Sequence, residues 1–129
     1  MKKSSLVVLA AVSLVSAGSV FAATSGAICS GSATAGAGAT LATPTTSDAE
    51  FVRQGFPTKC SANVHLSYSQ TAINFAVGSG SVKGKTAFGG STAGGAVAKV
   101  ADCNTSTGCD AAAATAAATT ALNAAGGST

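Results

Sequence analysis

Cysteine is the residue type in this chain that most clearly specifies chemistry. The four cysteines are Cys29, Cys60, Cys103 and Cys109. An even number predicts a disulfide framework in a chain that folds in an oxidising compartment. Three pairings are possible, and we favour Cys29 with Cys60 and Cys103 with Cys109, because only five residues separate the last two. Structural zinc sites usually pair cysteines across about two to four residues and often add histidines, so this spacing disfavours a metal.

Few residues in the sequence could act in acid–base or nucleophilic catalysis. His65 is the single histidine, and the four carboxylates are Asp48, Glu50, Asp102 and Asp110. A catalytic base must be held by a third group, whereas all four carboxylates fall in segments that we expect to be loops. No Gly-x-Ser-x-Gly pattern surrounds a serine. We therefore predict no catalytic residues and no enzyme, and we keep a small secreted hydrolase only as a third alternative.

The segment 78–86, Gly-Ser-Gly-Ser-Val-Lys-Gly-Lys-Thr, is the nearest approach to a nucleotide motif. It places five residues between its first glycine and Gly-Lys-Thr, one more than a phosphate-binding loop has. The residues that follow alternate like a strand, whereas that motif opens a helix. We expect no cofactor, and we interpret Lys83 and Lys85 as solvated side chains that discourage uncontrolled strand pairing.

The amino terminus, residues 1–22, has the pattern of a secretory signal peptide. Lys2 and Lys3 form a basic region, residues 6–17 form an apolar region, and Val-Phe-Ala at 20–22 fits a cleavage site. The short Met-Lys-Lys start is typical of bacterial signal peptides. The sequence thus predicts a protein that is secreted or held at the cell surface.

The remaining segment, 23–129, has 107 residues, enough for one domain. Its five Lys and Arg residues and four Asp and Glu residues give a net charge of +1. Electrostatic capture of nucleic acid or anionic membrane needs a basic patch, so we expect neither partner. The segment has no run of about 20 strongly apolar residues, so we also expect no membrane span.

Large apolar side chains are scarce in this segment. It holds only sixteen Val, Ile, Leu, Phe and Tyr residues. Full burial of one such side chain contributes roughly 1.5 to 3 kcal/mol, while ordering each residue costs about 1 kcal/mol or more. Covalent staples, partial disorder or assembly must therefore supplement a thin core.

Alternation of apolar and polar residues from Cys60 to Val100 predicts an antiparallel β meander. The expected strands cover 62–69, 73–77, 82–88 and 96–101. Glycine-rich segments predict turns at 78–81 and from 89 to 95.

The segment 23–46 contains mainly Ala, Gly, Ser and Thr. We predict either a flexible arm, which Cys29 would staple to the domain, or a strand that pairs through its backbone. We favour the arm. The next segment, 47–55, is expected to form either one helical turn or a polar loop that carries Phe51 and Phe56 into the core.

The segment 110–129 begins with Asp110, a good helix N-cap, and continues as an alanine-rich run. About fifteen residues are marginal for an isolated helix in water. We leave open whether the segment forms a frayed helix or a disordered tail.

Taken together, these patterns predict a mainly β fold, a small disulfide-stapled antiparallel meander or sandwich with an Ala-rich C-terminal helical or disordered tail. The expected divisions are a signal peptide at 1–22, an arm at 23–46, a β-rich domain at 47–109 and the tail at 110–129.

Low charge, a thin core and exposed strand edges favour a secreted structural protein that assembles with copies of itself, or with other surface proteins, into an extracellular filament or surface layer. The alternative is a monomeric secreted binding module that presents disulfide-constrained loops.

Overall fold

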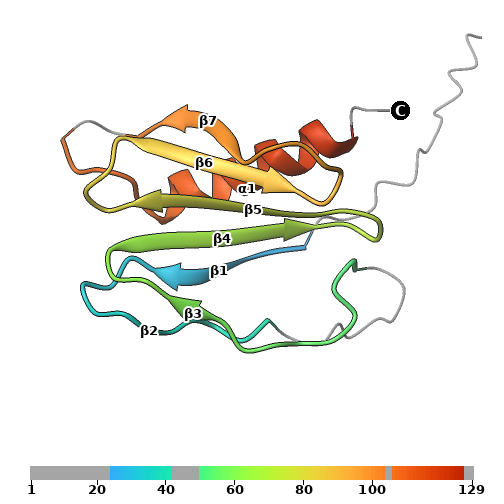
Figure 1. Ribbon diagram of the computed structural model, residues 1–129, viewed down its shortest axis with the longest axis horizontal. Coiled ribbons are helices and arrows are strands. Elements are labelled where there is room, and N and C mark those ends of the chain that lie inside the picture. Colours follow the sequence, from blue (N-terminus) through green and yellow to red (C-terminus); the bar gives the residue numbers. More distant parts are fainter. Residues whose placement is uncertain (1–23, 42–49, 104–105, 127–129) are drawn as a thin grey trace, which may run out of the picture.

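The structure is a computed structural model, and it describes residues 24–41, 50–103 and 106–126. The expected signal peptide at 1–22 lies outside the described residues. The described part of the chain forms a five-stranded antiparallel sheet, a two-stranded sheet and one helix (Figure 1). The mainly β, antiparallel class is confirmed.

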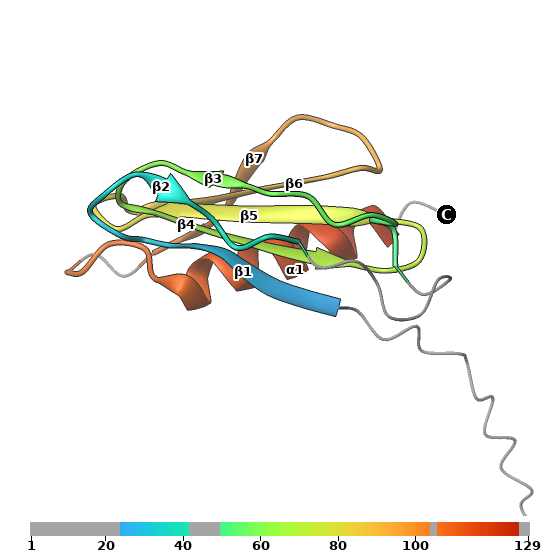
Figure 2. The ribbon, with the colours of Figure 1, turned by 90° about the horizontal axis from the view of Figure 1, so that it is seen from below.

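Seven strands and one helix make up these layers. The elements are β1 (Thr24–Ser30), β2 (Gly36–Ala37), β3 (Lys59–Cys60), β4 (Val64–Gln70), β5 (Phe75–Ser81), β6 (Thr86–Ser91), β7 (Ala98–Asp102) and α1 (Ala111–Gly126). The large sheet has the order β1-β4-β5-β6-β7, so four consecutive strands form the expected meander and β1 joins it beside β4. The helix covers one face of this sheet (Figure 2).

Two of the expected turns lie inside strands. Gly78 to Ser81 belong to β5 and Gly89 belongs to β6, so both turn predictions are wrong at these positions. The physical reason is the helix. A Cβ at Gly78 would collide with backbone atoms of Ala114 and Ala118, and a Cβ at Gly89 would lie 2.9 Å from the carbonyl oxygen of Ala117. The absence of a side chain at these glycines allows the helix to pack closely on the sheet. The chain turns instead at 82–85 and 92–97.

The alanine-rich segment forms α1, and the helix is packed. Its buried residues are Ala114, Ala117, Ala118 and Leu122. Asp110 Oδ1 accepts a hydrogen bond from the backbone N–H of Ala113 at 2.8 Å, as an N-cap does. A helix that is marginal by itself is stabilised here by tertiary contact with β4, β5 and β6.

The segment expected to be an arm contains β1, which pairs with β4 along its length and has a bulge between Ala27 and Cys29. The alternative of a strand that pairs through its backbone is the one found. Gly26 leaves room for an aromatic ring, since a Cβ there would lie 2.8 Å from Cε1 of Tyr68.

Residues 50–55 contain no helical turn, and 47–49 lie outside the described residues. Phe51 and Phe56 are 41% and 45% exposed, so the prediction that they enter the core is wrong. The segment is held instead by Gln70, which is buried. Its side chain accepts a hydrogen bond from Val52 N–H and donates one to Glu50, both at 3.1 Å.

Two disulfides join the pairs favoured from the sequence, Cys29–Cys60 and Cys103–Cys109. The first links β1 to β3. It lies in a cluster with Ile28 and Leu41 that covers the β1 and β4 end of the sheet, on the face opposite the helix. The second closes the loop before α1.

Candidate functional site

His65 lies on the helix-covered face of β4, under the backbone of Gly31. A Cβ at Gly31 would collide with the imidazole ring, so the glycine is required for this packing. The Nδ1 atom of His65 is buried and has no hydrogen-bond partner within the described residues. Ser67, on the same face of the strand, is paired with Thr115 through their hydroxyl oxygens at 3.1 Å.

The three described carboxylates have structural partners. Asp110 caps the helix and Glu50 accepts from Gln70. Asp102 forms an ion pair with Lys99 at 2.7 Å. Asp48 lies outside the described residues. Across the described part of the chain, none of these groups hydrogen-bonds to His65, so the geometry supplies no base held by a third group.

Metal and phosphate chemistry gain no support from the geometry. Among the described residues no three His, Cys, Asp or Glu side chains gather where they could hold a metal ion, and all four cysteines are in disulfides. The segment 78–86 is the hairpin of β5 and β6, where Gly80 pairs with Ala87 and Ser79 with Phe88. A strand follows its Gly-Lys-Thr, so no helix N-terminus is directed at a phosphate there.

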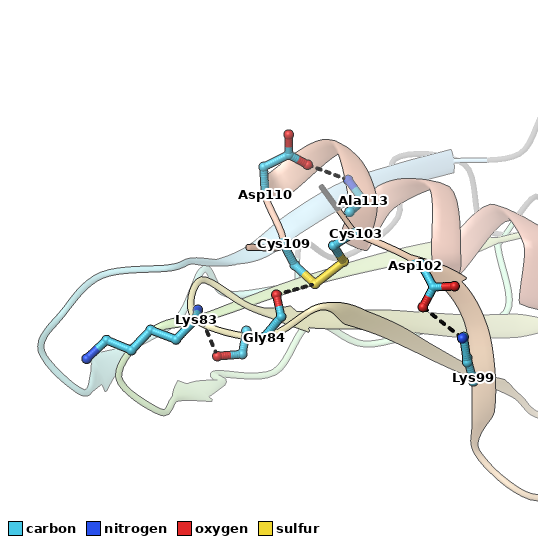
Figure 3. The surroundings of a disulfide bond; sticks show 9 residues. Lys83, Gly84, Lys99, Asp102, Cys103, Cys109, Asp110 and Ala113 are labelled. Carbon is cyan, nitrogen blue, oxygen red and sulfur yellow. Dashed lines mark hydrogen bonds and ion pairs between the residues drawn. A yellow bond between two sulfur atoms is a disulfide. The ribbon is translucent and has the colours of Figure 1, made fainter. Parts of the chain in front are cut away.

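The loop closed by Cys103–Cys109 is anchored against the turn between β5 and β6 (Figure 3). The backbone N–H of Cys109 donates to the carbonyl of Ser81 at 3.0 Å, and that of Cys103 donates to Lys85 at 2.9 Å. The carbonyl oxygen of Gly84 lies 3.6 Å from Sγ of Cys109. This disulfide therefore fixes the start of α1 on the sheet. In the chain-entropy account so short a loop contributes about 2 kcal/mol.

The face of the sheet opposite the helix carries larger apolar side chains. Val77 pairs with Gly90, and a Cβ at Gly90 would lie 3.0 Å from Val97, so these residues share one face. Phe75 and Phe88 lie on it too, by the alternation of β5 and β6. We call Val77, Phe88 and Val97 the open face. Phe75, at its border, stacks on Tyr68 and packs against the cluster of the first disulfide. Figure 1 looks onto it, and no ribbon crosses in front of β5 and β6 there.

Exposure distinguishes this face. Phe88 is 44% exposed and Val97 is 69% exposed, whereas Ala87, next to Phe88 but directed at the helix, is fully buried. Phe75, Val77, Gly90 and Val97 contribute to the lining of an open hollow of about 270 Å³. That volume is below the roughly 300 to 1,000 Å³ of sites that enclose a small ligand.

The open face has one charged pair at its rim. In the register of β6 and β7, Lys99 lies opposite Phe88 and Asp102 lies opposite Thr86. Both charged side chains are therefore on the open-face side of β7. Because the two side chains form an ion pair with each other, they add no net charge to the face.

The sequence indicated the alternation of these residues but not their exposure. Alternation assigns Val77 and Phe88 to faces of their strands, yet both faces read as apolar or small, and nothing local shows which one a helix will cover. The signal that could have located the helix is the glycine and alanine content of the other face, at Ala76, Gly78 and Ala87.

No family model, curated protein or solved structure matches the chain. Within the described residues, no helix is long and apolar enough to cross a membrane.

Proposed function

We propose that this protein is an exported structural subunit that assembles with copies of itself in an extracellular filament or surface layer. The observation that carries the proposal is incomplete burial. Of the sixteen large apolar residues after position 22, only Ile28, Leu41 and Leu122 are buried. Five others are exposed, namely Phe51, Phe56, Ile73, Phe88 and Val97.

Exposed apolar residues in isolation are ordinary, but two of these five, Phe88 and Val97, lie on one sheet face, and apolar side chains grouped on one surface are typical of an interaction site. At about 25 cal/mol per Å² of apolar area, covering Phe88 or Val97 would contribute about 1 to 2 kcal/mol each. Contributions of this size are a sizeable fraction of the roughly 5 to 15 kcal/mol that stabilises a typical domain.

Charge and covalent structure also support the proposal. A net charge of +1 over 23–129 gives copies of the chain little mutual repulsion. Two disulfides suit an oxidising, extracellular environment. The first described strand begins at Thr24, so cleavage after Ala22 would leave every described strand intact.

The alternative, a monomeric binding module, would have to use loops. The segment 92–97 is exposed along its length and projects from the sheet (Figure 2). The two ends of the Cys103–Cys109 loop are less suited to recognition, because backbone hydrogen bonds of both cysteines hold these ends against the sheet.

Sedimentation of the mature, oxidised protein over a concentration series, with negative-stain microscopy, tests the proposal. We expect the mass to rise with concentration and ordered assemblies to form. A monomer of the mature mass at every concentration would contradict the proposal and favour the binding module.

A further inference from the structure

We propose that two copies of this chain pack open face to open face about a two-fold axis. Each helix would then lie on the outside of the pair, and the β2–β3 layer and the segment 92–97, which rise on the open-face side of the sheet, would flank the contact (Figure 2). This inference rests on the proposed assembly and specifies one of its contacts, the one that pairs two copies. Because a two-fold contact closes on itself, a filament or layer needs a second contact as well.

The β7 edge of the large sheet is poorly suited to joining copies strand to strand, and the β1 edge is occupied at one point. β7 has five residues, carries Lys99 and has a register shift opposite Ala87 and Phe88. Short length, lysine and bulges are the features that limit edge pairing. At the other edge, the carbonyl of Ile28 in β1 already accepts a hydrogen bond from Ala39 N–H at 2.9 Å. The sheet face is therefore the better surface for a copy.

The charges on the open face favour a second copy over a charged partner. Lys99 and Asp102 are 56% and 69% exposed and neutralise each other. A nucleic acid, an anionic lipid or an acidic peptide would meet no net positive charge from this pair. A second copy brings the same balanced pair, and Lys99 of one chain has an opposite charge available in Asp102 of the other.

The face combines a projecting ring with a neighbouring recess. Phe88 is a protruding, half-exposed ring, and the hollow of about 270 Å³ beside it is lined in part by Val77, Gly90 and Val97. A two-fold contact places each protrusion against the recess of the other copy, because residue i contacts j and j contacts i.

The test is sedimentation equilibrium of mature, oxidised protein with three variants. Phe88→Lys places a charge at the centre of the contact, and Phe88→Ser removes the ring without adding charge. Ile73→Lys is the matched control. Ile73 is more exposed than Phe88, at 77%, but it lies in the turn between β4 and β5, beside Leu122 near the end of α1.

We expect wild type and Ile73→Lys to form dimers with equal dissociation constants, and both Phe88 variants to weaken the dimer at least about tenfold. Thermal unfolding at concentrations where the chain is monomeric establishes that the variants fold, and Phe88→Ser carries the test if Phe88→Lys does not. Association that persists in folded Phe88 variants would overturn the face-to-face contact while leaving assembly intact. A wild-type chain that stays monomeric would overturn both.

Discussion

The two faces of the large sheet bury very different residues. The helix-covered face is built from Ala76, Gly78, Ala87 and Gly89, and α1 adds mainly alanine. The open face carries larger side chains, among them Phe88 and Val97, yet leaves those two exposed. On this sheet, small residues are fully buried while two of the large apolar side chains remain exposed.

The difference shows how a chain with few large residues can still fold. Small residues let the backbone of α1 come into contact with the backbone of β5, so dispersion contacts replace side-chain bulk. Cys103 and Cys109 extend this cluster with Ala87 and Ala117, and their disulfide restrains the unfolded chain. On the open face, Phe88 and Val97 are then left exposed for contacts outside the domain.

Gly78→Val should have the largest effect, because it attacks the helix-covered face directly. Its side chain would occupy the position of the Ala114 and Ala118 backbone, so α1 must move away from the sheet. We expect a loss of more than about 3 kcal/mol in the free energy of unfolding, measured by urea denaturation.

Gly36→Val is the matched control, since a Cβ at Gly36 meets nothing within 4 Å. It should change the free energy of unfolding by less than about 0.5 kcal/mol. Equal stability of Gly78→Val and wild type would show that the helix does not lie in close contact with β5.

Removing one hydroxyl group from the helix-covered face should have a smaller effect on the free energy of unfolding. Ser67 is 1% exposed, and its oxygen lies 3.1 Å from that of Thr115 on the helix. Ser67→Ala should cost about 1 kcal/mol in the free energy of unfolding, because it removes a buried hydrogen bond.

Ser79→Ala, on the opposite face of the neighbouring strand, provides the comparison. Ser79 is only partly buried, and its replacement should be nearly neutral in the same denaturation experiment. An equal loss in the free energy of unfolding for both variants would contradict the claim that the helix-covered face is more tightly packed than the opposite face.

Local sequence patterns predicted some elements well. The alternation around Leu66 and Tyr68 gives β4, and the short spacing of Cys103 and Cys109 gives their disulfide. Both are determined within a few residues of chain, which is why they could be anticipated.

The misassigned elements depend on partners distant in sequence. Glycine has the same local preferences in a turn and under a closely packed helix, so Gly78 could be read as a turn residue. The helix posed the converse problem, since propensity alone leaves it marginal and its stability comes from the sheet. The exposure of Phe88 could not be predicted, because alternation does not show what covers a face.

The most direct test of the central claim is the fluorescence of Phe88→Trp. The chain has no tryptophan of its own, so tryptophan emission, excited selectively over that of Tyr68, would report on this position alone. The account predicts a blue shift as concentration rises, in step with a doubling of mass measured by sedimentation. Emission that stays at the solvent-exposed value while the mass doubles would contradict it, because the copies would then associate without covering the open face.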